Sequence, residues 1–405
     1  MGFFRALSVL TRIGVFPCRA SFIHGVAFMN SPNRRSLEVD FFRGVVLLII
    51  AVDHISGSVL SRFTLHSYAF CDSAEVFVFL GGYASAAAYT TLAVNRSHGA
   101  ARLRFLKRSW EIYRAYLFTA VMMLLGGALL MWLRVDTPML QITEWPSFLA
   151  RPLGLTFDIA TLRHQPYLSA VLPMYAMFAL AVPFVVPLAE RKPVVVLFGS
   201  LGVWLFASSL AQWLPSAYAE GWSFNPFAWQ LMFALGILAR VQPISAEFHD
   251  SKTALWMTRA AIVVFLTFAF AKLFLETQAP PGYMKQNLAS LRIVSFVVIA
   301  WLFARAVHAG WIKALAKSLP SVVNIGKQGL VCFIAGACMS LVIDTALRLV
   351  SFGQYQWIAG LSGDAVAIGS LIWLAAFWRD RKETQRARLP KQQPVPAHAT
   401  HRRDR

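Results

Sequence analysis

Two ionisable residues stand side by side in an otherwise apolar stretch of the chain. The segment DFFRGVVLLIIAVDHISGSVL, residues 40–60, has the hydrophobicity of a membrane-crossing helix, yet it contains Asp53 and His54. A charge at the centre of a bilayer costs about 2.5–3.5 kcal/mol on insertion scales, so such residues usually face a protein interior or a water-filled cavity. Because histidine changes its charge near neutral pH, His54 is suited to act as a general base.

An arginine lies eleven residues before this histidine. At about 100° per residue, eleven steps complete roughly three helical turns, so Arg43 and His54 are expected on one helix face, about 16 Å apart along the axis. Such a face could hold a long donor molecule, with its anionic end bound by Arg43 and Arg35 and its reactive end at His54. The alternative is that Arg43 reaches lipid headgroups and His54 bonds a neighbouring helix.

Two carboxylates open the next apolar segment, CDSAEVFVFLGGYASAAAY. Asp72 and Glu75 have the spacing of a helix N-terminal capping box, which explains Asp72 better than Glu75. A carboxylate beside His54 would fix its tautomer and stabilise the imidazolium that forms on proton abstraction. Asp53 lies about 100° around the helix from His54, so Glu75 on the neighbouring helix is the better geometric candidate.

Two further stretches combine helix-start signals with side chains suited to ligand binding. In WSFNPFAWQLMFALG, Asn225 is a plausible N-cap, while Trp229 and Gln230 would lie at the outer interface and could hold a sugar ring. Structural roles explain most of this signal. KQNLASLR runs from Lys285 to Arg292, which either form an interfacial positive patch or bind an anionic group or an oxyanion.

The composition sets these residues in a membrane protein. The chain has 405 residues, of which 57% are hydrophobic and only 14% charged, and its mean hydropathy is +0.56. Ten apolar stretches are long enough to span a bilayer. They cover residues 41–60, 74–94, 113–133, 167–188, 193–213, 225–240, 256–276, 290–308, 328–349 and 357–378. The sequence therefore predicts an all-α polytopic membrane protein with about ten transmembrane helices.

The charge distribution predicts the topology. The net charge of +19 comes from Lys and Arg in short connections between apolar runs, which indicates positive-inside sorting rather than nucleic-acid binding and places both termini in the cytoplasm. Residues 1–34 form a cytoplasmic or interfacial extension, 35–378 a transmembrane domain and 379–405 a basic, disordered cytoplasmic tail. The long external connection, 134–166, is expected to be re-entrant or interfacial. The four cysteines predict neither disulfides nor a metal site.

Six stretches occur in order between about residues 35 and 335. They are RSLEVDFFRGVVLLIIAVDHI, DSAEVFVFLGGY, LPMYAMFALAVP, FNPFAWQLMFALG, KQNLASLR and IGKQGLVCF. Together they resemble the OpgC family of membrane acyltransferases, which adds succinyl groups to osmoregulated periplasmic glucans and belongs to the wider acyltransferase family 3 grouping. The resemblance implies a multi-pass enzyme of the bacterial inner membrane that moves an acyl group from cytoplasmic acyl-CoA to glucan hydroxyls, with succinyl-CoA as the expected co-substrate.

The resemblance also assigns residues. In the wider grouping, an arginine and a histidine of the first helix are the main functional residues, and they correspond to Arg43 and His54. Three positions depart from the family pattern: Gly81 stands where serine is usual, Ala170 where an acidic residue is usual, and Gly329 in the motif KQGL. The departure at Ala170 removes a carboxylate and therefore bears on acceptor binding and acyl preference.

The combined prediction is a membrane O-succinyltransferase with no bound cofactor or metal. His54 acts as the base, Glu75 or Asp53 orients it, and Arg43 with Arg35 binds the acyl-CoA donor. The acceptor side is assigned to Asp72, Asn225, Trp229, Gln230, Lys285 and Arg292.

The expected partners are acyl-CoA, a periplasmic or other envelope glycan, and the lipid bilayer, with no nucleic acid. Two other functions fit the residues less well: an O-acetyltransferase of another envelope glycan, and a proton-coupled transporter that uses the buried His, Asp and Glu as a relay. The sequence contains no inverted repeat to favour the transporter. A structural scaffold would leave Asp53 and His54 unexplained.

Overall fold

The computed structural model describes residues 36–388, apart from 136, 220, 276–281 and 350–352. In these ranges every regular element is a helix, as expected for an all-α polytopic membrane protein. The predicted extension, residues 1–34, and the predicted donor-binding residue Arg35 lie outside the described residues.

Among the described residues, seven helical segments are long and apolar enough to cross a bilayer, or eight if one bent pair counts as a single span. The seven are Ser73–Asn95 (α3), His98–Trp132 (α4), Tyr167–Arg191 (η3 and α8), Lys252–Leu275 (α13 and η5), Ser290–His308 (α15), Gly329–Leu349 (α18) and Gly353–Gln385 (η6 and most of α19, Gln356–Arg388). The bent pair joins Pro193–Leu205 (α9) to Ala207–Trp213 (α10 and η4) at an angle of 68°.

The other two predicted spans are shorter helices, α2 (Leu37–Asp53) and α11 (Pro226–Val241), of 17 and 16 residues. The span predicted at 41–60 therefore starts earlier and ends at Asp53, and residues 54–72 form turns and two short 3₁₀ helices, η1 (Leu60–Phe63) and η2 (Leu65–Ser67). Hydropathy missed this end because the residues that follow Asp53 are also mostly apolar.

Close backbone contacts hold the short helices at the centre of the bundle. A methyl group at Gly82 of α3 would lie 2.0 Å from the Phe233 carbonyl oxygen, so only glycine allows α3 and α11 to approach this closely. Gly44 of α2 is equally near the Val322 carbonyl of α17 (Pro320–Lys327). Gly82 therefore packs directly on α11.

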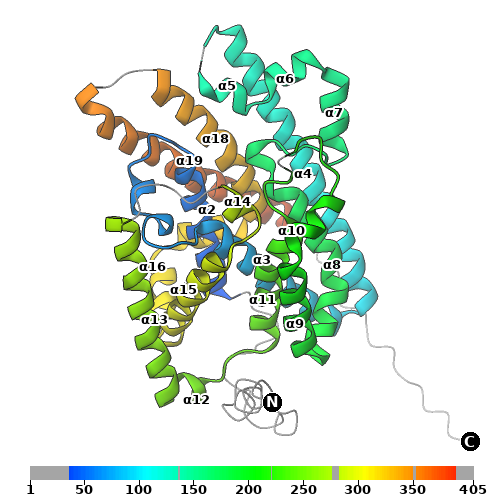
Figure 1. Ribbon diagram of the computed structural model, residues 1–405, viewed down its shortest axis with the longest axis vertical. Helices are drawn as coiled ribbons and strands as arrows, with labels where there is room; N and C mark the ends of the chain where they lie inside the picture. Colours follow the sequence, from blue (N-terminus) through cyan, green and yellow to red (C-terminus); the bar gives the residue numbers. More distant parts are fainter. Residues whose placement is uncertain (1–35, 136, 220, 276–281, 350–352, 389–405) are drawn as a thin grey trace, which may run out of the picture.

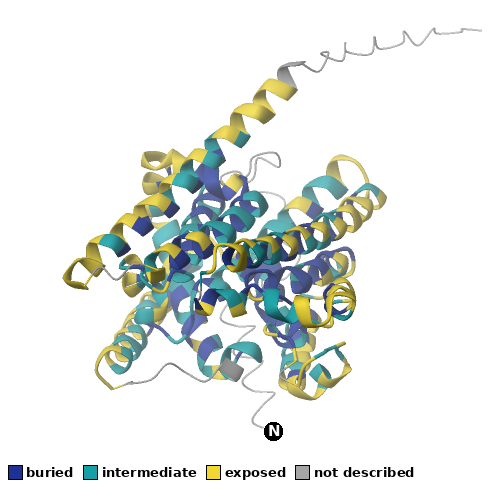
Figure 2. Ribbon diagram, turned by 90° about the horizontal axis from the view of Figure 1, so that it is seen from above, coloured by how far each residue is buried: buried dark blue, intermediate teal, exposed yellow. Residues whose placement is uncertain are grey.

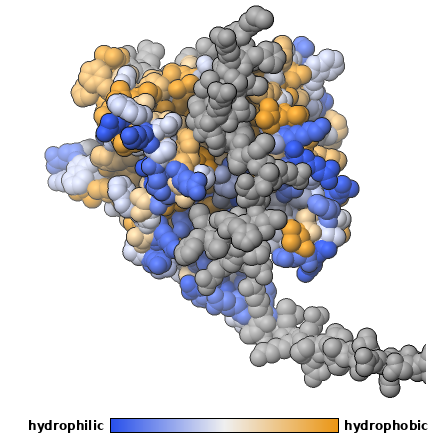
Figure 3. Space-filling view, turned by 90° about the horizontal axis from the view of Figure 1, so that it is seen from below, coloured by the Kyte–Doolittle hydropathy of each residue, from blue (hydrophilic) through white to orange (hydrophobic). Residues whose placement is uncertain are grey.

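Buried residues occupy the middle of the bundle, and exposed ones surround it (Figure 2). Many exposed side chains are large and apolar, as is typical of a surface that faces lipid tails rather than water. Figure 3 shows the end of the bundle seen from below, where hydrophilic residues gather in clusters between apolar ones. The orientation of the protein in its membrane stays a prediction.

The predicted external connections meet at the opposite end of the bundle, at the top of Figure 1. Three short helices form most of segment 134–166: α5 (Pro138–Ile142), α6 (Trp145–Ala150) and α7 (Pro152–Ala160). Ala217 donates a backbone hydrogen bond to the carbonyl of Arg163 at 2.7 Å, and Asn225 donates one to the carbonyl of Gln286 at 3.2 Å. These loops therefore form one connected layer above the helices.

The C-terminal helix extends further than its apolar segment. Residues 379–388, expected to belong to a disordered tail, form the end of α19, which runs from Gln356 to Arg388. The remainder of the predicted tail, 389–405, lies outside the described residues. Helix α19 projects beyond the bundle in the view from above (Figure 2).

Candidate active site

His54 lies at the C-terminal end of α2, where it caps the helix. Its ring nitrogen Nδ1 lies 2.7 Å from the carbonyl oxygen of Ile50. A carbonyl oxygen can only accept a hydrogen bond, so Nδ1 donates, and the neutral imidazole must then carry its lone pair on Nε2. The helix end thus sets the tautomer that general-base catalysis at Nε2 requires.

The structure corrects the predicted orientation of His54 by a carboxylate. Asp53 accepts a hydrogen bond from Thr64 Oγ1 at 2.9 Å and lies 3.7 Å from Nδ1 of His66, so it serves the following loop instead. Glu75 is bound elsewhere. The Ile50 carbonyl takes this role because the last four carbonyls of a helix have no partner within the helix.

Four charged residues form a compact ionic cluster near this point. Arg292 of α15 donates from Nε to Glu75 Oε1 at 2.5 Å and from Nη2 to Asp72 Oδ2 at 2.9 Å. Lys285 of α14 (Gly282–Gln286) pairs with the same Asp72 oxygen at 2.8 Å. Two cations thus balance two carboxylates. This balance explains how Glu75 can be fully buried, since an unpaired buried charge would be costly.

Asp72 and Glu75 also form the predicted capping box of α3. Asp72 accepts a hydrogen bond from the Ala74 backbone N–H at 2.7 Å, and Glu75 accepts one from the Asp72 backbone N–H at 2.9 Å. Burial opposes ionisation of Asp72, but the charges of Lys285 and Arg292 outweigh it and hold the pKa of this carboxyl below its usual range. Asp72 is therefore an anion that keeps both cations in place.

Arg292 and Lys285 differ in their access to a ligand. The Arg292 side chain is 8% exposed and bonds both carboxylates, so its role is to hold the cluster together. The Lys285 side chain is 42% exposed. Lys285 is therefore the cation of the cluster that can also meet a substrate.

The predicted acceptor residues in and next to α11 bond other parts of the protein, mainly the segment that contains Lys285, instead of facing a ligand. Trp229 is fully buried and donates from Nε1 to the carbonyl of Lys285 at 3.0 Å. Asn225 is the N-cap, as expected, and its Nδ2 donates to Asn287 Oδ1 at 2.9 Å. Gln230 donates to the Ser200 carbonyl at 2.8 Å. A sugar platform on Trp229 is excluded because its ring is enclosed in the core.

Lys285 and Asp72 of the ionic cluster both act electrostatically on His54. The ring of Tyr167, at the start of η3 (Tyr167–Ser169), lies 5.7 Å from the His54 ring. Tyr167 is 60% exposed, so this side of His54 opens toward the loop layer. No motif in the sequence pointed to Tyr167 as a site residue.

Arg43 lies on α2, eleven residues before His54. Other stretches that carry the family resemblance also meet there. A methyl group at Gly329 would lie 2.8 Å from Arg43 Nη2, and one at Gly81 would lie 2.7 Å from the Tyr175 ring. Arg43 also acts electrostatically on Tyr175. Two of the departures from the family pattern, Gly81 and Gly329, thus leave room around Arg43 and Tyr175, while Ala170 is buried at the N-cap of α8 (Val171–Arg191).

Two buried carboxylates fix the loop that follows His54. Asp344 of α18 accepts a hydrogen bond from the Ser56 backbone N–H at 2.6 Å. Asp364 of α19 accepts from the N–H groups of Val59 and Leu60 at 3.0 and 2.9 Å. Asp364 is a second carboxylate within an apolar stretch, like Asp344. Its place near the start of an apolar helix was the signal that could have found it.

Together these features define a polytopic helical membrane protein with a histidine at a helix end, bonded through Nδ1 to that helix, and a partly exposed lysine that acts on it electrostatically. The described residues contain no group of three or more His, Cys, Asp or Glu side chains that could hold a metal ion. The chain belongs to the OpgC protein family, whose model matches residues 35–383. Membership implies an acyltransferase with a glycan acceptor. No curated protein and no solved structure matches the chain.

Proposed function

We propose that the protein transfers a succinyl group from cytoplasmic succinyl-CoA to hydroxyl groups of periplasmic glucans in the bacterial inner membrane. The observation that carries the proposal is the 2.7 Å contact between His54 Nδ1 and the Ile50 carbonyl, which leaves Nε2 as the base. Family membership supplies the reaction class. The partly exposed ammonium of Lys285 supports an anionic acyl group over a neutral one.

The reaction follows from this arrangement. His54 Nε2 takes the proton of a glucosyl hydroxyl while the hydroxyl oxygen attacks the thioester carbonyl carbon. The tetrahedral intermediate collapses by breaking its C–S bond, and the departing thiolate receives the proton from the imidazolium. The products are a glucan succinyl ester and free CoA, and His54 returns to its neutral form. No cofactor is consumed.

The donor enters this scheme from the Arg43 end of α2. Arginine binds phosphate groups through paired N–H donors, so Arg43 is our candidate for the anionic part of CoA. The helical rise between Arg43 and the end of α2 is about 15 Å, over which an extended acyl-bearing arm would reach His54. A second donor-binding role for Arg35 is part of this proposal, although Arg35 lies outside the described residues.

The terminal carboxylate of a succinyl group requires a cation near the reacting carbon. Lys285 fits because its ammonium is partly exposed and its backbone is fixed by Trp229. An ammonium group has three N–H donors, and the bond to Asp72 uses only part of them. Lys285 can therefore bind Asp72 and a substrate carboxylate together.

Mass spectrometry of periplasmic glucans tests the proposed function. Glucans from cells that carry the intact gene are expected to show succinyl-sized mass increments, and glucans from a deletion strain are expected to lack them. Complementation with the wild-type gene should restore the increments. Glucans unchanged by deletion would contradict the proposal, and an acetyl-sized increment lost on deletion would point to an O-acetyltransferase.

Replacement of Lys285 by methionine tests the source of acyl preference. The Lys285→Met protein is expected to lose about 10–100-fold in kcat/KM for succinyl-CoA, because a hydrogen bond to a charged group contributes about 1.5–3 kcal/mol. Acetyl-CoA has no terminal carboxylate. The rate of transfer from acetyl-CoA, which is expected to be lower than that from succinyl-CoA, should therefore change much less. The measurement is a CoA-release assay with both donors.

Lys272→Met is the matched control for this experiment. Lys272 also lies near the end of an apolar helix, where its ammonium lies 5.5 Å from the centroid of the Phe70 ring. Its replacement should leave the ratio of kcat/KM for succinyl-CoA to kcat/KM for acetyl-CoA unchanged. An equal loss with both donors in the Lys285 variant would show that Lys285 acts on the fold and not on the succinyl group.

A further inference from the structure

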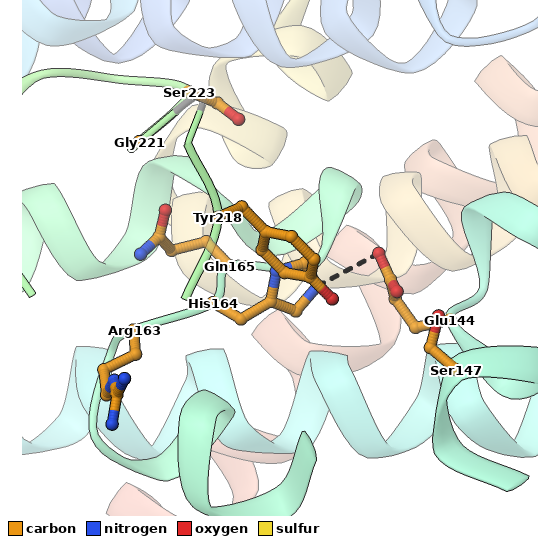
Figure 4. Close-up of a pocket in the computed structure, with 8 residues that line it drawn as sticks. All are labelled: Glu144, Ser147, Arg163, His164, Gln165, Tyr218, Gly221 and Ser223. Atoms are coloured by element: carbon orange, nitrogen blue, oxygen red, sulfur yellow. Dashed lines mark ion pairs between the residues drawn. The ribbon is translucent and has the colours of Figure 1, made fainter. Parts of the chain in front are cut away.

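A cavity of about 330 Å³ opens in the loop layer, apart from His54 and the ionic cluster. Three segments that are distant in sequence line it, as Figure 4 shows. The lining residues are Glu144, Ser147, Arg163, His164, Gln165, Tyr218, Gly221 and Ser223. Its volume lies at the lower end of the range of small-molecule sites, about 300–1,000 Å³, and suits one or two sugar rings rather than a whole polymer.

The lining carries hydrogen-bonding groups without an excess of charge. His164 Nε2 lies 3.0 Å from Glu144 Oε1 (Figure 4), whereas the Arg163 guanidinium pairs with Asp158 at 3.5 Å. Gln165, Ser147 and Ser223 add neutral donors and acceptors. A balanced set of planar polar groups favours a neutral ligand rich in hydroxyls over an anion such as a CoA phosphate.

An aromatic ring completes the lining. Tyr218 meets the His164 ring edge to face at 4.7 Å between centroids and is 39% exposed. In Figure 4 its ring lies next to His164, beside the His164–Glu144 ion pair and near the centre of the lining residues. An amphipathic ring of this kind packs against the C–H face of a sugar. The hydroxyl of Tyr218 interacts with the Arg151 guanidinium.

The cavity walls are held rigidly. Tyr116 donates from its buried hydroxyl to the carbonyl of His164 at 2.7 Å, and Ala217 donates to the carbonyl of Arg163 at the same distance. Glu144 adopts a left-handed backbone conformation with φ of 63°, which a non-glycine residue keeps only where its surroundings impose it. The site is therefore formed before a ligand arrives.

Two connections join the cavity to the active site. On one side, Gln165 is two residues from Tyr167, whose exposed ring lies 5.7 Å from His54. On the other side, a methyl group at Gly221 would lie 3.6 Å from the amide nitrogen of Gln286, the residue after Lys285. A chain-like ligand seated in the cavity would thus have a neighbouring unit near the base.

We propose that this cavity is an acceptor subsite that binds a glucosyl unit of the glycan, next to the unit whose hydroxyl reacts at His54. The inference rests on the proposed function and adds the place where the acceptor is held. Tyr218 supplies the stacking surface, Glu144 with His164 binds ring hydroxyls, and Tyr167 guides the adjoining unit toward His54.

Calorimetric titration of the full-length protein in nanodiscs with a linear glucotetraose tests this subsite. The Tyr218→Ala and Glu144→Gln variants are expected to bind glucotetraose at least about tenfold more weakly than the wild type. Tyr218→Phe, which keeps the ring, should lose less. The control is Tyr355→Ala, which removes a tyrosine that is 58% exposed and lies outside the cavity, and which should bind as the wild type does.

The outcomes separate the subsite from the proposed reaction. A His54→Asn protein should bind glucotetraose normally and transfer nothing, because binding and proton abstraction use different residues. Wild-type affinity in both Tyr218→Ala and Glu144→Gln would overturn the subsite, as would no binding of glucotetraose to the wild type at millimolar concentration. Binding that depends on these residues, without succinyl transfer by the wild type, would support the subsite and refute the succinyltransferase.

Discussion

His54→Asn is expected to lower kcat for acyl transfer by about 10²–10⁴-fold, the range that a positioned general base contributes. The asparagine amide can still donate to the Ile50 carbonyl in place of Nδ1, but it has no basic nitrogen at the position of Nε2. The variant should therefore fold as the wild type does while losing the chemical step. The measurement is CoA release together with product mass, at matched amounts of folded protein.

His66→Gln is the matched control for the histidine prediction. His66 belongs to the same loop and contacts Thr64 and Asp53, but it is exposed and does not face the ionic cluster. Its replacement should change kcat by no more than a few-fold. Retention of near-wild-type transfer in His54→Asn would remove His54 as the base, whatever the behaviour of His66→Gln.

The second large effect is expected in stability. Arg292→Ala should reduce the free energy of unfolding by about 3–5 kcal/mol, because removing one partner of a buried ion pair leaves the other charge uncompensated. Here the fully buried Glu75 would lose the cation that pairs with it, while Asp72 would keep Lys285. Unfolding in mixed detergent micelles, followed by tryptophan fluorescence, measures the change.

Two further variants give the arginine prediction its controls. Arg102→Ala removes an exposed arginine of α4 and should alter the free energy of unfolding by less than about 0.5 kcal/mol. The double variant Glu75→Gln with Arg292→Met removes both charges and should be less destabilised than Arg292→Ala alone. Equal stability of Arg292→Ala and Arg102→Ala would show that the cluster does not support the fold.

The sequence identified the members of the ionic cluster but not their pairing. Glu75 stood out by its capping-box spacing from Asp72, and Arg292 as a cation at the end of KQNLASLR. Their contact joins residues 217 positions apart, and no local pattern encodes a contact of that separation. Only the packing of α3 against α15 shows that Arg292 serves the cluster and leaves Lys285 for a ligand.

Local rules worked where the interaction itself was local. The capping box of Asp72 with Glu75 and the N-cap at Asn225 were both predicted from spacing and are both present. The sugar platform on Trp229 failed because hydropathy placed it at an interface, whereas the ring is enclosed between α11 and the segment that contains Lys285. Burial of an aromatic residue depends on tertiary neighbours that periodicity does not reveal.

The termination of α2 was equally hidden. Hydropathy carried the first span to residue 60 because the segment after Asp53 is still largely apolar. The helix stops at Asp53, and the carboxylates that receive the following N–H groups come from α18 and α19, almost three hundred residues later. His54 thus became a helix cap rather than a residue within a span.

The two carboxylates that hold the loop after His54 also have an entropic consequence. Fixing one residue's backbone costs roughly 1–2 kcal/mol of conformational free energy, and Asp344 and Asp364 fix Ser56, Val59 and Leu60 when the protein folds. A substrate therefore does not have to order this loop at each turnover, and its binding energy stays available for the transition state. The loop that follows the proposed base is thus preorganised by side chains of α18 and α19.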